Sequence, residues 1–406
     1  MPHVILCRFG ELFLKLGNRA RFQRVLLDNV SRALAGLPGL SVGSPHGRIV
    51  VRVDESNAPT ADADLMARAC ARLSRVFGLV SLSPAEVAAL DVDAISAAAV
   101  RAAAAAAAFP PVAAAGRSRP AAAPRFKVEA RRSNKRFPLP SPEIARVVGA
   151  RVAESLGLDV DVHHPDLRIG IEVADDGAYV YAGALAAPGG LPAGVSGRAL
   201  LLLSGGIDSP VAGWLAAKRG LVLDAVYFHS PPYVGPKSLD KVMDLARILR
   251  GWQAAESLTV VGFTEAQKRL RDAGPAELAV VLYRRMMMRI ADAIADRNRA
   301  AALVTGENLG QVASQTISNL SVIEAAARRM VLRPLLTYDK VETTAHARRI
   351  GTYETSVLPF DDCCSLFVPP HPATAARLID VERVEAQLDI AALAAAAAAA
   401  AEPVAL

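Results

Sequence analysis

Residues Ala199–Val211 read ALLLLSGGIDSPV, and this stretch decides the fold of the C-terminal half of the chain. The apolar run Ala199–Leu203 is too short for a helix of its own and ends at a turn signal, so it predicts a buried parallel strand. The Gly205-Gly206 pair lets the backbone N–H groups turn inward with no Cβ in the way of a bound anion. We expect Ser209 to cap the next helix, with Pro210 at its first position. A strand, a glycine turn and a helix N-terminus in this order predict a phosphate site.

The type of phosphate loop follows from its spacing. The Gly-x-x-x-x-Gly-Lys-[Ser/Thr] spacing of a Walker loop is absent, and so is the dinucleotide pattern Gly-x-Gly-x-x-Gly. Residues 204–209 resemble the Ser-Gly-Gly-x-Asp-Ser loop of ATP pyrophosphatases, which cut ATP to AMP and pyrophosphate while they adenylate a substrate. Asp208 places an anion beside an anion site, which is explained if Mg²⁺ joins its carboxylate to phosphate. The alternative is an ordinary strand-to-helix turn.

Length and charge suggest several domains and a polyanionic partner. A chain of 406 residues predicts two or three domains, and its 52% hydrophobic content is raised by alanine. The net charge is only +6, but residues 1–195 hold 23 Lys and Arg against 18 Asp and Glu, a balance of +5. The excess is greatest in Arg117–Arg136, with eight basic residues and one acidic residue. A polyanion is therefore a plausible partner for the N-terminal half.

The sequence favours a cytoplasmic protein. The apolar run at the start is too short for a signal peptide, and no stretch of eighteen apolar residues would cross a membrane. Four cysteines, two of them adjacent, do not make a disulfide framework.

The first half of the chain predicts two small α+β units. In the first unit, strands are expected at 4–9 and 48–53, and helices at 18–35, capped by Asn18, and at 61–77. The arginines on the first helix are either a solvated face or phosphate contacts. The second unit, 79–184, is expected to hold an alanine-rich helix at 94–108, a loose segment at 109–124, a strand at 125–130, a helix at 142–156, and strands at 167–173 and 178–181 joined as a hairpin.

One loop of this second unit is strongly basic. Residues 131–137, the basic loop, read RRSNKRF and place four cations around one aromatic ring. Such a loop suits an RNA backbone with a base stacked on Phe137. A basic loop that serves only solubility is the alternative.

The second half predicts an α/β fold, a doubly wound, mainly parallel sheet. Pro188–Pro192 marks a domain boundary, and strands and helices alternate beyond it. Ligands of such sheets bind at the carboxyl ends of the strands, which here are Ser204–Gly206, Tyr227–Ser230 and Thr305–Asn308. We expect Ile390–Leu406 to be a low-complexity alanine tail without chemistry.

The motifs together resemble one family. The chain, over about residues 3–390, resembles the bacterial tRNA uridine 4-sulfurtransferases, the 4-thiouridine synthetases of ThiI type. The resemblance rests on 17-GNR-19, 131-RRSNKRF-137, 189-GGLP-192, 203-LSGGIDSP-210, 229-HSPP-232, 284-RRMMMR-289, 305-TGENLGQVASQT-316 and 361-DDCC-364. It implies an N-terminal ferredoxin-like domain at 1–60, a THUMP tRNA-binding domain at 61–185, an ATP pyrophosphatase (PP-loop, adenine-nucleotide alpha-hydrolase-like) domain at 186–390 and the alanine tail at 391–406.

The resemblance also implies site residues. It places catalytic roles on Asp208, Cys364 and Lys340, the last as a second cation beside Mg²⁺. The implied ATP contacts are Leu202, Leu203, Ser204, Gly205, Gly206, Asp208, Ser209, Tyr227, Phe228, Arg284, Gly306 and Gln315. The implied tRNA contacts are Arg19, Arg131, Arg132, Lys135, Arg136 and Phe137. We expect Met286, Met287 and Met288 to be helix core instead.

Cys363 and Cys364 are candidate sulfur carriers. They lie between two aspartates and a proline-rich stretch, where a loop is expected and a core cysteine is not. By resemblance, Cys364 is the better match to the family's sulfur-handling cysteine, the alternative being a packed core residue. Cys7 and Cys70 are expected in the core. The rhodanese domain of longer members is absent from this sequence, so the persulfide forms on the cysteine pair or comes from a separate cysteine desulfurase. No Cys-x-x-Cys supports an iron–sulfur cluster.

The predicted activity is ATP-dependent transfer of persulfide sulfur to a tRNA uridine. ATP adenylates uridine O4, and a persulfide sulfur then displaces AMP at C4, with Mg²⁺ near Asp208. Sulfur supply for the thiamine thiazole and a homodimer are further family associations. The alternatives are a synthetase of the same class acting on a small molecule, and an RNA-binding protein with a vestigial nucleotide site.

Overall fold

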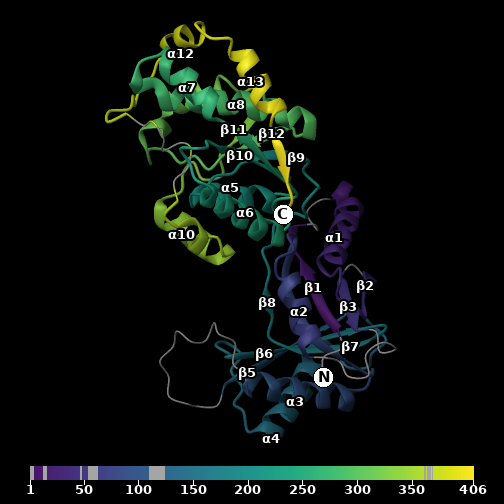
Figure 1. Ribbon diagram of the computed structural model, residues 1–406. Helices are drawn as coiled ribbons and strands as arrows, with labels where there is room; N and C mark the ends of the chain where they lie inside the picture. The colour runs from purple at the N-terminus through teal and green to yellow at the C-terminus, as the bar shows by residue number, and fades with distance from the viewer. Residues whose placement is uncertain are drawn as a thin grey trace. The chain divides into compact units, whose positions relative to one another are not determined.

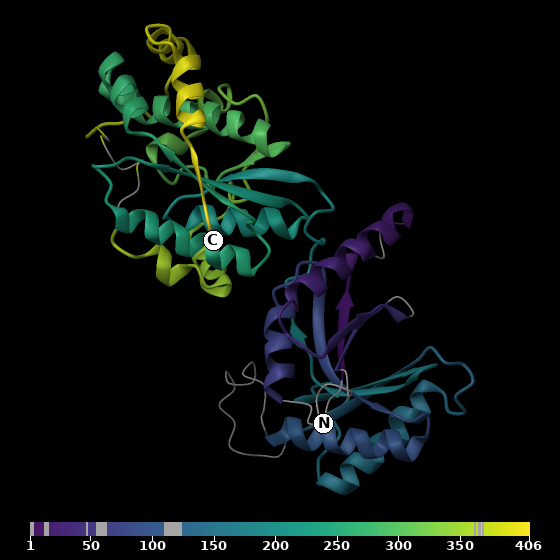
Figure 2. The same ribbon diagram turned by 45° about the vertical axis from the view of Figure 1, so that its right-hand side comes forward.

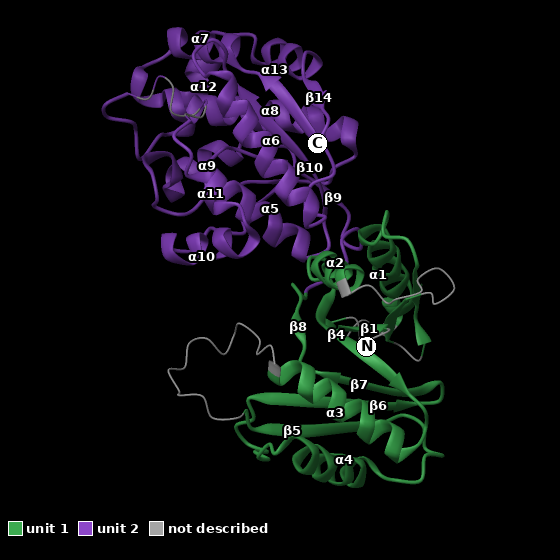
Figure 3. Ribbon diagram, turned by 60° about the horizontal axis from the view of Figure 1, so that its bottom comes forward, with its two compact units in different colours: residues 1–189 green, residues 190–406 purple. Residues whose placement is uncertain are grey.

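The computed structural model describes residues 4–11, 16–45, 48–53, 63–108, 124–360, 363, 367 and 369–406. The chain forms two compact units, Met1–Gly189 and Gly190–Leu406, coloured separately in Figure 3. The division falls inside the Pro188–Pro192 stretch. Most of the segment 109–124 that we expected to be loose lies outside the described residues. No helix in the described ranges is long and apolar enough to cross a membrane.

Unit 1 is built on one mixed sheet whose strand order is β2-β3-β1-β4-β7-β6-β5, with β8 paired to β4. Neither β2 nor the long β4 was predicted from the sequence. Strand β4 is the shared element: it pairs with β1 between Leu79 and Ala85, and with β7 between Glu86 and Ala88. The strands are β1 (Val4–Phe9), β2 (Leu40–Gly43), β3 (Ile49–Val53), β4 (Leu79–Ala88), β5 (Phe126–Arg132), β6 (Leu167–Ala174), β7 (Gly177–Ala182) and β8 (Leu185–Ala186).

The helices of unit 1 bury the faces that their sequence periodicity predicts. Helix α1 turns Phe22, Leu26 and Val30 into the core, although the Asn18 side chain makes no capping hydrogen bond. The alanines of α3 allow it to pack closely against α4 and the sheet. The predicted hairpin is confirmed, with Ala174 paired to Gly177. The helices are α1 (Arg19–Ala33), α2 (Ala63–Leu73), α3 (Val92–Ala108) and α4 (Ser141–Leu156).

An ion-pair cluster joins the two parts of the unit 1 sheet. Glu172 on β6 accepts hydrogen bonds from Arg8 Nη2 of β1 at 2.8 Å and from Arg48 Nη1 at 2.9 Å. The guanidinium of Arg8 also lies 4.6 Å from the ring centroid of Tyr181. These contacts join residues more than a hundred positions apart in the chain, so the two parts behave as one unit.

Unit 2 is a doubly wound sheet of order β13-β12-β9-β10-β11-β14, which confirms the predicted fold class. Every pairing is parallel except that of β14 with β11. Helices α7, α8, α12 and α13 cover one face and α5, α6 and α10 the other (Figures 1 and 2). The strands are β9 (Arg198–Leu202), β10 (Val222–His229), β11 (Leu258–Gly262), β12 (Ala302–Val304), β13 (Met330–Leu332) and β14 (Glu402–Val404). The helices are α5 (Asp208–Lys218), α6 (Pro236–Gly251), α7 (Thr264–Ala273), α8 (Ala279–Asn298), α9 (Ile317–Glu324), α10 (Lys340–Ile350), α11 (Tyr353–Ser356), α12 (Leu378–Glu385) and α13 (Ile390–Ala399).

The C-terminal segment departs from the expected inert tail. Helix α13 packs on α8 and buries Ala394 and Ala398, while β14 extends the sheet by pairing Val404 with Leu258. Alanine has a side chain small enough for close helix packing, and the edge strand satisfies backbone groups of β11. The low-complexity composition therefore conceals an integral part of unit 2.

Candidate active site

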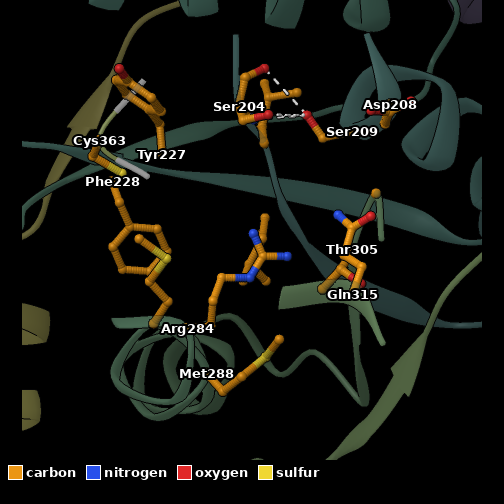
Figure 4. A pocket seen from close by; sticks show the side chains of 14 residues that line it. Ser204, Asp208, Ser209, Tyr227, Phe228, Arg284, Met288, Thr305, Gln315 and Cys363 are labelled. Carbon is orange, nitrogen blue, oxygen red and sulfur yellow. Dashed lines mark hydrogen bonds between the residues drawn. The ribbon is translucent and has the colours of Figure 1, made fainter. Parts of the chain in front are cut away.

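A pocket opens at the carboxyl ends of β9, β10 and β12, where ligands of doubly wound sheets bind. Figure 4 shows its two sides, with Tyr227, Phe228 and Cys363 opposite the polar group of Ser204, Ser209 and Asp208. All predicted nucleotide contacts except Gly205 and Gly206 are among the described residues that line it. The lining residues are Leu202, Leu203, Ser204, Asp208, Ser209, Tyr227, Phe228, Arg284, Met287, Met288, Thr305, Gly306, Gln315 and Cys363.

Four lining residues were not predicted as contacts. Met287 and Met288 are buried in helix α8, as their expected core role requires, yet both also face the pocket. Thr305 precedes Gly306 at the end of β12, so its position in the motif was the signal available in the sequence. Cys363 lines the pocket, and it is 4% exposed. An apolar wall beside a polar wall is suited to a ligand with an aromatic base and a phosphate chain.

Ser209 has a different role from the predicted helix cap. Helix α5 starts one residue earlier, at Asp208, and its N-cap Ile207 makes no side-chain capping bond. The Ser209 hydroxyl instead accepts a hydrogen bond from Ser204 N at 2.8 Å and lies 2.9 Å from Ser204 Oγ. Ser209 therefore closes the glycine turn against the end of β9. The amides of the first turn of α5 remain directed toward the loop, which favours an anion there.

Gly306 is required by packing against the protein backbone. We expected a glycine here to allow a ligand to approach closely. A Cβ at this position would instead lie 2.5 Å from the backbone N of Ser209 and 2.7 Å from its Cα. No real Cβ contact is that short, so only glycine lets the end of β12 touch the first turn of α5. This contact fixes the phosphate loop against the neighbouring strand.

Asp208 carries two polar partners at the start of α5. The Nζ of Lys340 lies 3.1 Å from Oδ1 and 3.2 Å from Oδ2, and Gln311 Nε2 donates to Oδ2 at 3.1 Å. Lys340 is the first residue of α10, which begins with a capping box between Asp339 and Glu342. The cap fixes the start of α10 and thereby the lysine. The structure thus places the predicted cation beside the predicted carboxylate; Gln311 was missed, although it lies in the motif 305–316.

Arg284 is held by a buried carboxylate. Its Nη2 donates to Glu307 Oε1 at 2.8 Å, and Arg333 Nε donates to Glu307 Oε2 at 2.7 Å. Burial raises the pKa of Glu307, but the two guanidinium groups outweigh this and hold its pKa below the usual value. Two cations share one anion, so the cluster has a net positive charge, with Arg284 on the pocket. Such a charge favours a phosphate ligand.

The cysteines fall into two groups. Cys7 and Cys70 lie in the core of unit 1, as predicted, and burial raises the pKa of their thiols to about 12 and about 11. Both thiols are therefore protonated and unreactive at neutral pH. Cys363 lines the pocket in unit 2. Cys364, like Asp361 and Asp362, lies outside the described residues, so its role in sulfur handling stays a prediction.

The basic loop divides into exposed and structural residues. Arg131, Lys135 and Arg136 are exposed. Arg132 Nη1 instead donates to the carbonyl oxygens of Phe137 at 2.6 Å and of Leu139 at 3.2 Å, which holds the loop closed. Phe137 is 5% exposed and packs in the core of unit 1, so the expected stacking of a base on its ring is wrong. Arg19, in contrast, is exposed at the first residue of α1.

Comparisons with known proteins cover the whole chain. Family models match residues 4–83 (ThiI ferredoxin-like domain), 91–182 (THUMP domain) and 194–390 (thiamine biosynthesis protein, ThiI). The first match extends past our predicted boundary at residue 60, consistent with the pairing of β4 with β1.

Relatives and a solved structure agree with these matches. A probable tRNA sulfurtransferase of Moorella thermoacetica is 47% identical over 95% of this chain and 93% of its own length. One from Caldanaerobacter subterraneus is 42% identical over 96% of each chain. The crystal structure of a 4-thiouridine synthetase–RNA complex with bound ATP is similar with a TM-score of 0.84 and 35% identity, over 100% of this chain and 99% of the other.

Proposed function

Because this chain belongs to the ThiI family of tRNA sulfurtransferases, we propose that it uses ATP to convert a uridine of tRNA to 4-thiouridine through an adenylated intermediate. One observation carries the proposal: a single pocket is lined both by the phosphate loop and by Cys363. Activation by ATP and transfer of sulfur need these two features within reach of the same atom. A small-molecule synthetase or an RNA-binding protein would not need the cysteine.

ATP fits the two sides of the pocket. The adenine ring lies against Tyr227 and Phe228, while the phosphates meet the amides of the first turn of α5 and the guanidinium of Arg284. Asp208 is the carboxylate that would hold Mg²⁺, which binds through one or two carboxylates together with substrate phosphates and offsets their charge. The donor set fits this mode, since the described residues form no cluster of three or more potential ligands that could cage a metal alone.

The first step is adenylation. Uridine O4 attacks the α-phosphorus of ATP, and the bond to pyrophosphate breaks. The loop amides and Lys340, which lies beside Asp208, stabilise the charge that develops on the leaving pyrophosphate. The product carries AMP on O4, which makes the oxygen at C4 a good leaving group. The residues of this chain act by binding and orienting the two substrates.

The second step moves sulfur. The terminal sulfur of a persulfide, carried on Cys364 by family resemblance, bonds to C4, and AMP leaves with O4. A second thiol then breaks the sulfur–sulfur bond, which leaves 4-thiouridine and a disulfide. Cys363 lines the pocket and is the candidate for that thiol. A cysteine desulfurase supplies the persulfide. Unit 1 binds tRNA through the exposed cations Arg131, Lys135 and Arg136 of the basic loop. Sulfur supply for the thiamine thiazole and a homodimer stay predictions.

Reconstitution tests the proposal. The protein, ATP, a cysteine desulfurase, cysteine and unmodified tRNA should yield 4-thiouridine together with AMP. Asp208→Ala should abolish AMP formation while tRNA binding survives. AMP formation that needs no tRNA would favour the small-molecule synthetase, and absence of any AMP would favour the vestigial site. Normal pyrophosphate release by Asp208→Ala would remove this carboxylate from the mechanism.

Matched serine variants separate the two cysteines. Cys364→Ser should still form AMP but transfer no sulfur, because adenylation requires the loop and not a thiol. Cys363→Ser should bind persulfide yet fail to complete transfer. The measurement is 4-thiouridine per tRNA, normalised to folded protein. Full activity of Cys364→Ser would end its assignment as the sulfur carrier, and loss in Cys363→Ser alone would reverse the two roles.

A further inference from the structure

Two buried polar side chains lie behind the cysteine that lines the pocket. Ser230 directly follows β10, and Gln267 lies on α7; both have 0% of their surface exposed. Neither belongs to the described lining of the pocket. A buried amide is costly unless both of its halves are hydrogen-bonded. The partners of Gln267 therefore indicate what it does.

Gln267 links the end of β10 to the cysteine segment. Ser230 Oγ donates to Gln267 Oε1 at 2.5 Å, and Gln267 Nε2 donates to the carbonyl oxygen of Cys363 at 2.9 Å. The orientation of the amide is determined by its partners, because a carbonyl oxygen can only accept and so must face the NH₂ group. The bond is made to the backbone of Cys363 and not to its thiol, so it fixes the position of the residue without engaging the sulfur.

The segment around Cys363 depends on such anchors. Between α11 and α12 its backbone is held at either end by side chains of other elements. Lys241 Nζ donates to the carbonyl oxygen of Leu358 at 2.8 Å, and Asn319 Nδ2 donates to that of Ala373 at 2.7 Å. Cys363 lies between these two anchors in the chain. Gln267 therefore fixes the middle of a segment that lacks the ladder of hydrogen bonds of a strand.

We propose that Gln267 is a positioning residue for sulfur transfer: it holds the backbone of Cys363 against the pocket, and Ser230 holds Gln267. The proposal rests on the proposed function and names a residue that touches neither substrate. Ser230 is three residues after Tyr227 and two after Phe228, so the chain Ser230–Gln267–Cys363 joins the strand that contacts the nucleotide to the segment that carries sulfur. Reacting atoms must be held within a few tenths of an ångström for efficient transfer.

The first test measures the position of Cys363 without any turnover. Gln267→Met keeps the length and helix propensity of the side chain but removes both hydrogen bonds. Native protein is treated with iodoacetamide, and the alkylation rate of each cysteine is followed by mass spectrometry. We expect Cys363 to react about tenfold faster in the variant, equivalent to about 1.4 kcal/mol. Cys7 and Cys70, buried in unit 1, should be unchanged and serve as the internal reference.

The second test separates positioning from general packing. Gln267→Met should form AMP at a rate within twofold of the unchanged protein, while 4-thiouridine formation falls about tenfold in kcat with unchanged KM for tRNA. Ser230→Ala, a smaller change, should move both readouts in the same direction by less, and keeps the test available if Gln267→Met does not fold. An unchanged alkylation rate at Cys363, or equal losses of AMP formation and sulfur transfer, would overturn the proposal. The alkylation result remains readable even if the unchanged protein makes no 4-thiouridine.

Discussion

Replacing Glu307 by Gln should destabilise unit 2 by about 3 kcal/mol. The Glu307 side chain is fully buried and accepts from Arg284 at 2.8 Å, Arg333 at 2.7 Å and Thr305 Oγ1 at 3.0 Å. Removing one partner of a buried ion pair costs about 3–5 kcal/mol, because the other charge stays buried without compensation. Glutamine keeps the shape and one acceptor, so the lower figure applies. Its NH₂ group then faces a guanidinium, which is also a donor.

Tryptophan fluorescence measures this effect in unit 2 alone. Both tryptophans of the chain, Trp214 and Trp252, lie in this unit. With an m-value of about 3 kcal/mol per molar urea, a loss of about 3 kcal/mol lowers the urea midpoint by about 1 M. Glu324→Gln is the matched control: Glu324 contacts the same Arg333 at 2.6 Å but its side chain is 52% exposed, so the expected loss is below about 1 kcal/mol.

The pH dependence gives a second check on the same variant. The pKa of Glu307 is lowered in the folded protein, because the opposing effect of burial is outweighed by Arg284 and Arg333. Its contribution to stability is therefore complete above the ordinary carboxyl pKa of about 4.5 and is lost as pH falls through the lower folded value. The gap between the unchanged protein and Glu307→Gln should shrink in that acidic range. Equal midpoints for the Glu307 and Glu324 variants at pH 7, or a gap independent of pH, would refute this reasoning.

Three further predictions concern other parts of the molecule. Gly306→Ala should reduce AMP formation more than tenfold, since its Cβ would meet the start of α5; Gly262→Ala, whose Cβ would meet nothing within 4 Å, should be neutral in the same assay. Replacing the three exposed cations of the basic loop by Ala should reduce the slope of log K for tRNA against log salt by roughly 0.9 for each phosphate that is no longer neutralised. Phe137→Ala should instead cost about 3–5 kcal/mol in unfolding measurements and leave that slope unchanged. Removing residues 390–406 should lower the thermal midpoint reported by tryptophan, because it uncovers α8 and the edge of β11, and an unchanged midpoint would restore the inert tail.

Local signals predicted much of this protein. The run Ala199–Leu203 and the glycines after it predicted a buried strand and a phosphate loop, because strand length, turn chemistry and helix starts are encoded within a few neighbouring residues. Alternation of such elements after residue 190 predicted a mainly parallel sheet. The same rule, that ligands bind at the carboxyl ends of strands, predicted that Tyr227, Phe228 and Gly306 lie at the site, and all three line the pocket.

Where local composition was a poor guide, tertiary contacts decided the outcome. The aromatic ring of Phe137 looked like a stacking platform among cations, yet it packs inward because the core formed by α3, α4 and the sheet has room for it. The alanine-rich C-terminus looked inert, yet its strand pairs with Leu258, more than a hundred residues earlier. Composition reports what a segment prefers in isolation, and packing partners from distant segments can override it.

The sequence by itself therefore determined the elements, their order and the residue types at the ends of the strands. Only the tertiary structure decided which side chains meet: Lys340 with Asp208 across 132 residues, and Gln267 with the carbonyl of Cys363 across 96. The physical reason is one of range. Backbone preference and hydrophobic period act over a few residues, whereas these contacts depend on how the helices of unit 2 pack against its sheet, which no local pattern encodes.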